Sequence, residues 1–577
     1  MSLRDIAGLP ERSISRQDVK HLPMAITLLV FIAIIVLFAS IFIGTLFFSF
    51  NNDQAVNIET FERVFLNPET YQLLWTTLLI GVLGGTVSVV VGGTFAWLVV
   101  RTNVLGKRWL RAGILLSITV PGVVRAIGWI LAFSPRIGFV NIYSQKLLGF
   151  TFFNIYSFWG IVFAIGFGGV PLAYIILEPA LKHIGAELEE ASRISGYGPL
   201  TTFRKVTIRL MAPGLISVFL LITLYGFGNF EYPLLFGSVQ GGLQTLATRI
   251  YFLITRRAVP QYDEASVIAL IYLVVALVII AIYHYVTQRT YRFETVGGSG
   301  VTHAPIDLGR YKYLATSFCF FIWFVEFVIP ILTVLLMSLS PNLSIIPGLT
   351  GPLTAVTFRN YVEILGTSTL GRIAMNTLFV ATVSALGTTL LSVFISYAIL
   401  KTGYSFSRIG DYIATLSLGI PPIVYGLAIF WMVFIVPGFS TIYGTIYPLV
   451  IAIVFLKIPH AVRIISTSLI QISDELEEAA QIVGWGWLAR FRRITLPLLA
   501  EGIVNSMLFI FVESAKELSA IILLLTAGNY VLSAHILLLY ERGASFLPQI
   551  SAISMLFIIV LTIFILLSRW VGSSRSY

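Results

Sequence analysis

Ionisable side chains lie inside long apolar stretches of this sequence, among them Arg125, Glu231, Glu326, Lys457, Glu513, Lys516 and Glu517. A charge is costly in hydrocarbon, so each is by default a candidate functional residue. Glu513, Lys516 and Glu517 follow the i, i+3, i+4 spacing, which places opposite charges on one helix face. Two interpretations stay open. The charges form ion pairs that steady helix packing, or Glu231, Glu513, Lys516 and Glu517 lie beside a translocation path for a charged solute.

A polar segment in the second half of the chain, 474–484, has the start and stop signals of a short helix. Ser473 or Asp474 can cap it, and Glu477 stands in a capping-box relation to Asp474. Acidic residues crowd its first turns, where the helix dipole favours negative charge. Gly484 suits the left-handed conformation that ends many helices. We therefore expect a short, well-delimited helix outside the apolar stretches.

The same design occurs earlier in the chain, where Glu187-Leu-Glu-Glu-Ala191 leads to Gly196. In the later copy Leu476, Ala479 and Val483 share one helix face, so we expect that helix to bury a narrow apolar stripe. A single loop of this kind would be read as an ordinary amphipathic helix. Two copies at corresponding positions favour a shared function.

The later segment resembles the membrane subunits of type I ATP-binding-cassette (ABC) importers. Their signature is Glu-Ala-Ala, three residues, Gly, nine residues, Ile, one residue, Leu-Pro. Glu478-Ala479-Ala480, Gly484, Ile494 and Leu496-Pro497 meet every position of it. The earlier copy keeps its Glu-Ala pair and its glycine, but Val206, Ile208 and Arg209 replace Ile, Leu and Pro. We expect this departure to weaken the earlier return segment and to leave its short helix intact.

The resemblance implies that 187–198 and 475–486 are coupling helices, which dock on a separate ATPase and transmit its closure to the transmembrane helices. Glu190 and Glu478 are the acidic residues expected to face that ATPase. The full set of ATPase-coupling residues that the resemblance implies is Glu187, Glu190, Ala191, Gly196, Glu475, Glu478, Ala479, Ala480, Gly484 and Pro497.

The chain has no Gly-x-x-x-x-Gly-Lys-Ser/Thr loop for binding nucleotide phosphates. The resemblance therefore implies that ATP-Mg is bound and hydrolysed by two copies of a cytoplasmic ATPase, that an extracytoplasmic binding protein delivers the solute, and that this chain is not an enzyme. The six histidines show no metal-ligand spacing. We expect the chain itself to bind no metal and no cofactor.

The phrase Ala515-Lys-Glu-Leu518, followed by Ile521-Leu-Leu-Leu524, is similar to the corresponding helix in ferric-iron permeases of this superfamily. Those permeases are also commonly two halves fused in one chain. The resemblance implies ferric iron as the first choice of substrate, with thiamine, polyamines and phosphonates as alternatives. An ion-coupled secondary transporter is the rival from a different class. It would have no reason to keep two acidic, glycine-terminated loop helices.

Composition independently indicates an all-α membrane protein. Hydrophobic residues make up 57% of the 577 residues and charged residues only 11%, against about 25% charged in soluble domains. A membrane helix needs about 20 apolar residues. Twelve such stretches are predicted, at 24–50, 72–100, 110–134, 153–178, 213–237, 264–286, 313–339, 373–400, 411–437, 441–467, 499–525 and 548–570.

Lys and Arg are distributed unevenly between the segments that connect these stretches. With the N-terminus inside, the inner segments hold 25 of them and the outer segments hold nine. This is the positive-inside pattern, so we expect a multi-pass protein of the inner (cytoplasmic) membrane, embedded in lipid, with both termini in the cytoplasm. The net charge of +10 is then a topology signal and does not indicate nucleic-acid binding.

An internal repeat divides the chain into two halves. Leu116-Ser-Ile-Thr-Val-Pro121 is echoed by Leu416-Ser-Leu-Gly-Ile-Pro421 at an offset of 300, and the acidic segments repeat at 288. A 12-residue deletion between Pro421 and Glu475 reconciles the two offsets. Six helices per half make the repeats parallel, as in several transporter families. The expected organisation is an N-terminal segment 1–23, a first half 24–286 with coupling loop 179–212, a linker 287–312, a second half 313–570 with coupling loop 468–498, and a tail 571–577.

Overall fold

The computed structural model describes residues 21–47, 58–183, 192, 194–237, 242–290, 305–343, 346, 351–401 and 417–573. These residues form helices and connecting segments, and a backbone bridge of β type joins Thr102 to Ile306. The α-helices of the first half are α2 (His21–Phe47), α3 (Ile58–Leu66), α4 (Pro68–Arg101), α5 (Lys107–Ser117), α6 (Gly122–Phe133), α7 (Phe139–Leu148), α8 (Phe158–Gly168), α9 (Val170–His183), α11 (Pro199–Thr202), α12 (Ile208–Phe227), α13 (Leu246–Thr255) and α14 (Tyr262–Thr290).

The second half repeats this order. Its α-helices are α15 (Tyr311–Trp323), α16 (Ile329–Ser338), α17 (Arg359–Leu365), α18 (Ser368–Lys401), α20 (Pro422–Ile435), α21 (Tyr447–Ile470), α22 (Asp474–Ile482), α23 (Trp487–Arg490), α24 (Leu496–Ala515), α25 (Leu532–Arg542) and α26 (Leu547–Ser573). Short π-helical turns are η1 (Phe203–Thr207), η2 (Pro233–Gly237), η4 (Phe324–Val328) and η8 (Phe491–Thr495). Short 3-10 turns are η5 (Leu353–Ala355), η6 (Ser417–Gly419), η7 (Phe439–Ile442), η9 (Ile522–Leu524) and η10 (Ala544–Phe546).

Corresponding helices of the two halves agree closely in length and position. α4 and α18 both have 34 residues, and α12 and α24 both have 20. Their starts differ by 300 and 288 residues, the two offsets read from the sequence. The predicted deletion falls between α20 and α21, where η7 stands in the place of α7. The repeat in the sequence is therefore a repeat of structure.

Nine helices in the described part of the chain are long and apolar enough to cross a membrane, or up to eleven if each of two bent pairs is one span. The count of twelve is not confirmed. The predicted span 110–134 consists of α5 and α6, which meet at an angle of 114°. Within the predicted span 411–437 the described helix is α20, whose 14 residues fall short of the usual length.

The predicted spans 213–237 and 499–525 also end too late. α12 ends at Phe227 and α24 at Ala515, about ten residues earlier than predicted. Gly228 caps the C-terminus of α12, and Lys516 caps the C-terminus of α24. After each cap the α-helix is interrupted. Apolar composition runs on past both interruptions, so hydropathy could not locate the helix ends.

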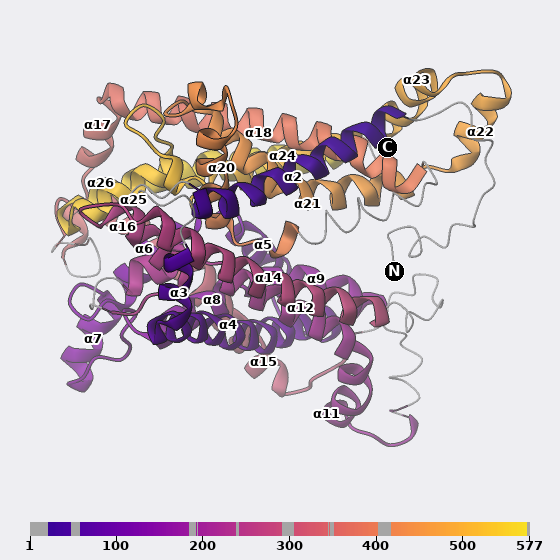
Figure 1. The fold of residues 1–577 in the computed structure, drawn as a ribbon. Coiled ribbons are helices and arrows are strands. Elements are labelled where there is room, and N and C mark those ends of the chain that lie inside the picture. The colour runs from indigo at the N-terminus through magenta and orange to yellow at the C-terminus, as the bar shows by residue number, and fades with distance from the viewer. Residues whose placement is uncertain are drawn as a thin grey trace.

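The first helix of each half packs against the other half. In α2, Ser40 Oγ donates a hydrogen bond to the Ala428 carbonyl at 2.9 Å, and Gly44 lies against Trp431 of α20. In α16, Thr333 Oγ1 donates to the Gly128 carbonyl at 2.9 Å. Figure 1 shows α2, in indigo, among the salmon and orange helices of the second half. The halves are thus separate in sequence but interlocked in space, and one apolar core contains residues of both.

Small residues permit the close packing within each half. In α4, a methyl group on Gly81 would lie 2.7 Å from the Thr223 carbonyl oxygen of α12, and one on Gly84 would lie 2.5 Å from Ile165 of α8. Small residues at helix interfaces let backbones approach in a membrane. α18 carries Ala381 and Ser384 at the equivalent positions, so both halves use the same device with slightly different residues.

Candidate functional site

The short helix α22 begins and ends where the sequence predicted. Ser473 Oγ caps it by accepting a hydrogen bond from the Glu475 amide at 3.2 Å. Gly484 has a φ of +86°, and the Trp485 amide donates to the Ala480 carbonyl at 3.0 Å, which closes the helix in the manner of a Schellman motif. The capping-box role predicted for Glu477 is wrong, because its carboxylate is used elsewhere.

Side chains of the long helix α18 hold α22 in place. Lys401 Nζ lies 2.6 Å from Asp474 Oδ1 and also donates to the Ile472 carbonyl. Tyr397 OH donates to Glu477 Oε2 at 3.0 Å, and Thr495 Oγ1 donates to Glu477 Oε1 at 2.7 Å. Charged hydrogen bonds of this kind are the stronger ones. α22 is therefore attached both to the end of α18 and to η8, which leads into α24.

The outward side of α22 is exposed. Glu475, Glu478 and Ala479 are exposed and Ala480 is half-buried. Ile482 and Val483 are 87% and 76% exposed. Leu476 is also exposed, at 49%. The apolar stripe is therefore not buried within the described part of the chain: it faces outward at one end of the bundle, where α22 extends beyond the other helices (Figure 1).

The first copy of this segment is described only from its end onward, because Glu187, Glu190 and Ala191 lie outside the described residues. Gly196 has a φ of +84°, and the Tyr197 amide donates to the Ser192 carbonyl at 3.2 Å. Lys205 Nζ lies 4.6 Å from the centre of the Tyr197 ring. The second half has the equivalent contact, with the Arg493 guanidinium 5.3 Å from the Trp485 ring. The two segments end in the same way.

The return segments are also alike. η1 and η8 are five-residue π turns that lead directly into α12 and α24. Pro497 occupies the first turn of α24, where its missing N–H is not needed, and Arg209 occupies the same place in α12. The departure of the first copy from the signature leaves the backbone of its return segment unchanged.

A cluster of four charges lies where α24 ends inside the apolar body. Lys516 Nζ is 2.6 Å from Glu513 Oε1, the i, i+3 pair that the spacing predicted. Glu517 pairs with Lys457 of α21 instead, at 2.9 Å, and Lys457 is also 3.6 Å from Glu513. We call Lys457, Glu513, Lys516 and Glu517 the central cluster. Its charges are balanced, two against two.

The central cluster reaches across to the first half at the sharp bend between α5 and α6. Lys516 Nζ donates to the Ile118 carbonyl at 2.9 Å. On the other side of the bend, a methyl group on Gly122 would lie 3.2 Å from Cδ of Glu231. Among the described residues Glu231 has no cation within 4.0 Å. The structure therefore brings all four predicted path residues to this bend, with one carboxylate in excess.

A second buried ion pair lies in the first half. Arg125 Nη1 of α6 is 3.2 Å from Glu326 Oε1 of η4, and their side chains are 7% and 0% exposed. Arg125 also donates to the carbonyls of Ser117 and Gly168. Because Glu326 belongs to the exchanged first helix of the second half, this pair joins the two halves. Both residues were recognised as intramembrane charges, but nothing in the sequence indicated that they meet.

Sequence reasoning also missed an ion pair between the halves, at the end of the bundle opposite α22. Arg256, just after α13, has Nη2 2.8 Å from Glu541 Oε1 of α25. Tyr251 OH lies 3.5 Å from both carboxylate oxygens of Glu541. No spacing signal connects residues 285 positions apart. The packing of the two halves against each other brings the end of α13 and the end of α25 together.

Metal-binding side chains do not gather within the described residues, where no group of three or more His, Cys, Asp or Glu is placed to hold an ion. The site residues divide into two sets. One set is a docking element at one end of the bundle. The other is a set of charges along the boundary between the halves. This arrangement can transmit motion and accommodate a passing charge.

Comparison with known families gives a match over two segments, residues 88–292 and 389–573, to "Binding-protein-dependent transport system inner membrane component". The two segments correspond to the two halves of the chain. They cover more than half of its length.

Comparison with individual proteins gives three informative relatives. A ferric transport system permease protein of Actinobacillus pleuropneumoniae is 26% identical over 562 residues, covering 96% of this chain and 78% of the relative. A putative ferric transport system permease protein of Haemophilus influenzae is 26% identical over 483 residues, 81% of this chain and 72% of the relative. An sn-glycerol-3-phosphate transport system permease protein of Escherichia coli is 27% identical over 247 residues, 41% of this chain and 82% of the relative.

Proposed function

Because this chain belongs to the binding-protein-dependent transport system inner membrane components, an ABC importer permease family, we propose that it carries ferric iron across the inner membrane. An extracytoplasmic binding protein delivers the iron, and two copies of a separate cytoplasmic ATPase supply the energy. Both termini face the cytoplasm. The observation that carries the proposal is α22, an exposed acidic and apolar helix fixed to two long helices.

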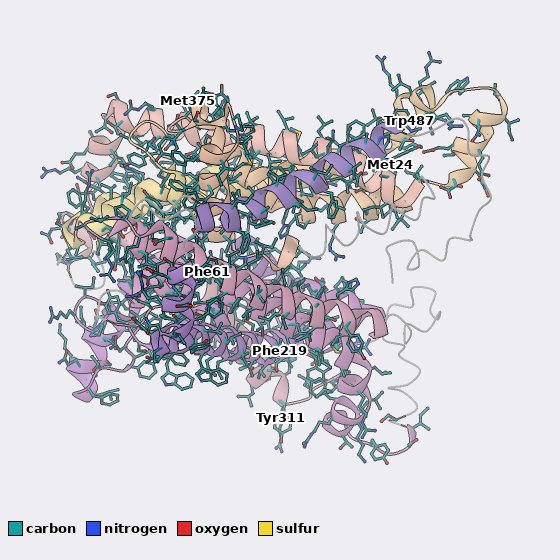
Figure 2. All side chains as sticks on the ribbon, viewed as in Figure 1. Met24, Phe61, Phe219, Tyr311, Met375 and Trp487 are labelled. Carbon is teal, nitrogen blue, oxygen red and sulfur yellow. The ribbon has the colours of Figure 1, made fainter. Side chains whose placement is uncertain are left out.

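The docking surface of α22 supports an ATPase partner. Ile482, Val483 and Leu476 are exposed together beside Glu475 and Glu478. An amphipathic helix that presents its apolar face outward fits a groove on a partner. The start of α2 and the return segment of the second half lie at the same end of the molecule, as the labels of Met24 and Trp487 show (Figure 2). This is the end that the distribution of Lys and Arg places in the cytoplasm.

The attachment of α22 supports mechanical coupling. The Lys401–Asp474 and Tyr397–Glu477 contacts link α22 to α18, and the Thr495–Glu477 contact links it to the start of α24. A displacement of α22 is therefore passed to both helices. The far end of α24 carries Glu513 and Lys516, so motion at the ATPase reaches the central cluster through one helix of 20 residues.

The charges at the boundary support a path for a cation. Lys457 and Lys516 balance Glu513 and Glu517, and Glu231 adds one further carboxylate beside Gly122. Ionisable residues in membrane proteins mark solute pathways when they face a path between helices. We assign Glu231, Glu513, Lys516 and Glu517 to this path, and Arg125 with Glu326 to the joint between the halves.

Iron is proposed as substrate on the strength of two relatives named for ferric transport, one matching 96% of this chain. Thiamine and polyamines fit the excess negative charge as well. Phosphonates are anions and fit the excess negative charge less well, although the Escherichia coli relative is named for sn-glycerol-3-phosphate transport. An ion-coupled secondary transporter does not explain why α22 is exposed at the end of the bundle.

Uptake of radiolabelled ferric iron by iron-starved cells tests the proposal. Cells with the chain should accumulate iron, and the Glu190→Ala/Glu478→Ala double variant should lose accumulation and co-purification with the ATPase. Glu62→Ala, an exposed acid on α3, is the matched control and should change neither. Iron uptake that ignores the chain removes iron as substrate. Uptake that survives the double variant and depletion of ATP would support the secondary transporter.

A further inference from the structure

A cavity of about 310 Å³ lies between the two halves at the end of the bundle opposite α22. Its walls come from α6 and η2 of the first half and from α25 and the start of α26 of the second half. Most of the wall is apolar, and the polar groups are gathered on one side. The lining residues that matter here are Ile130, Leu235, Tyr156, Arg256, Tyr540 and Glu541.

Glu541 is the one acidic residue in the cavity lining. Its carboxylate is held by a cation of the chain itself, since Arg256 Nη2 lies 2.8 Å away. The Arg256 side chain is 48% exposed, whereas that of Glu541 is 24% exposed. The guanidinium can therefore turn outward into water at small cost, while the carboxylate stays at the wall.

Two phenol groups, those of Tyr540 and Tyr156, also line the cavity. Tyr540 is the neighbour of Glu541 on α25, and its hydroxyl is hydrogen-bonded to that of Tyr156 from the first half. Phenol and carboxylate oxygens together suit a hard metal cation, and aromatic rings also attract organic cations. With Arg256 turned away, the cavity would present one negative charge and two oxygen atoms, contributed by both halves.

The elements that form two walls of this cavity also carry Gly122 and Glu231, which lie at the bend beside the central cluster. Along α6, Ile130 of the cavity and Gly122 beside Glu231 are eight residues apart, or about 12 Å. Along the other wall, Leu235 of the cavity follows Glu231 by four residues. The acidic groups Glu541 and Glu231 thus stand at two levels of the same boundary between the halves.

We propose that this cavity is the entry site of the path, that it takes a cationic substrate with Glu541 as counter-charge, and that Arg256 is the resident cation which the substrate displaces. The proposal rests on the importer function and on the predicted orientation, which puts this end outside. The proposal specifies a positively charged substrate, and both a hard metal cation and a polyamine meet this requirement. A phosphonate does not.

Terbium luminescence tests this proposal directly. Tb³⁺ is a hard trivalent cation whose emission is excited by energy transfer from nearby tyrosines, and it is titrated into the full chain in nanodiscs of neutral lipid. Glu541→Gln should weaken tyrosine-excited Tb³⁺ binding by at least about tenfold. Arg256→Gln should strengthen it by about tenfold, because it frees the carboxylate. The Tyr156→Phe/Tyr540→Phe variant should lower binding and keep the fold.

The opposite directions of the two charge variants separate the proposal from misfolding, which would weaken binding in both. Glu363→Gln, an outer acid paired with Arg359 at 2.6 Å, is the control and should leave this binding unchanged. Displacement of Tb³⁺ by La³⁺ but not by spermidine identifies a metal site, and the reverse identifies a polyamine site. Unchanged binding in Glu541→Gln, or no gain in Arg256→Gln, overturns the entry site.

The outcome is distinguishable from failure of the proposed function. If the charge variants leave Tb³⁺ binding unchanged while iron uptake still needs the chain, the importer stands and the entry site falls. If the variants behave as expected but iron uptake does not need the chain, the cation site stands and iron falls as the substrate.

Discussion

The two halves share one backbone but carry different charges at equivalent positions. Arg125 of α6 corresponds to Tyr425 of α20, and Gly169 corresponds to Lys457 of α21. The two cations nevertheless lie at similar places in their halves. Arg125 donates to the carbonyl of Gly168, and Gly168 precedes Gly169, the residue equivalent to Lys457. Each half thus places one buried cation near the same point of its fold, supplied by a different helix.

The acidic partners differ as well. Glu513 and Glu517 of α24 correspond to Tyr225 and Asn229 in the first half, so the first half has no acid at these two positions. The first half supplies Glu231 to the bend instead. It receives Glu326 from the exchanged helix. The comparison teaches that a duplicated backbone can be symmetric while the boundary between its halves is not. The second half supplies all four residues of the central cluster, and the first half supplies Glu231 beside Gly122.

The largest expected effect comes from breaking the pair in the first half. Arg125→Met leaves Glu326 buried without a cation, which we expect to destabilise the fold by about 3–5 kcal/mol. Thermal unfolding in detergent measures the loss. Arg125→Tyr/Glu326→Ala removes both charges and gives the first half the tyrosine of the second, so it should recover most of the stability. A double variant no more stable than Arg125→Met would show that the pair is not a unit.

A smaller loss is expected in the second half. Lys457→Met removes the partner of Glu517, while Glu513 keeps Lys516 at 2.6 Å, so we expect a destabilisation of about 2–3 kcal/mol. Lys457→Met/Glu517→Asn, which introduces the first-half asparagine, is the matched control and should restore stability. Iron uptake measured in parallel should stay low in the control, because the path has changed. Normal uptake there would argue for a purely structural cluster.

The attachment of the coupling helix gives a third, smaller effect. Tyr397 holds Glu477, whereas its first-half equivalent is Trp97, which packs on Phe203 with ring centres 4.4 Å apart. Tyr397→Phe removes the hydrogen bond and should loosen α22 by about 1 kcal/mol. Hydrogen exchange of the α22 amides measures this, and the segment ending at Gly196 should not respond. Equal changes in both segments would show that the halves are coupled here.

The smallest effect concerns the segment that joins the halves. Asp307 Oδ1 accepts hydrogen bonds from the Gly309 amide at 3.0 Å and from Asn103 at 2.6 Å, and these bonds hold its pKa below the usual aspartate value. The contact is present at neutral pH and is lost as the pH falls through that lowered pKa. Amide exchange at Leu308 and Gly309 should rise only in that acidic range. Asp307→Asn should flatten the pH dependence, and an unchanged profile would contradict the assignment.

The sequence predicted the docking helix well, because its signals are local. Ser473 and Gly484 mark its ends in the printed order of residues, and the structure uses both. Whether the apolar stripe of this helix is covered depends on distant parts of the structure. Leu476 and Val483 satisfy the spacing of a buried face, but α22 extends past the bundle, so no helix in the described part of the chain covers them. Periodicity identifies a face and does not say what the face meets.

Helix ends inside the apolar stretches were harder to predict for a related reason. Hydropathy is an average over about 19 residues, and it runs smoothly past Phe227 and Ala515. The bend between α5 and α6 is equally invisible to it, although Pro121 stands there. The backbone geometry just after Phe227 and Ala515 determines where α12 and α24 end. The segments that follow these ends bring Glu231 and Lys516 to the bend between α5 and α6.

The sequence by itself determined the membrane class, the two-half repeat, the ends of the short acidic helix and which side chains carry charge into the apolar body. Each of these depends on composition or on residues close together in the chain. The tertiary structure alone decided that the first helices are exchanged, that Arg125 meets Glu326, that Lys457 takes Glu517, and that Arg256 closes on Glu541. Those contacts join residues 60 to 285 positions apart, and the packing of whole helices, rather than any local preference, selects them.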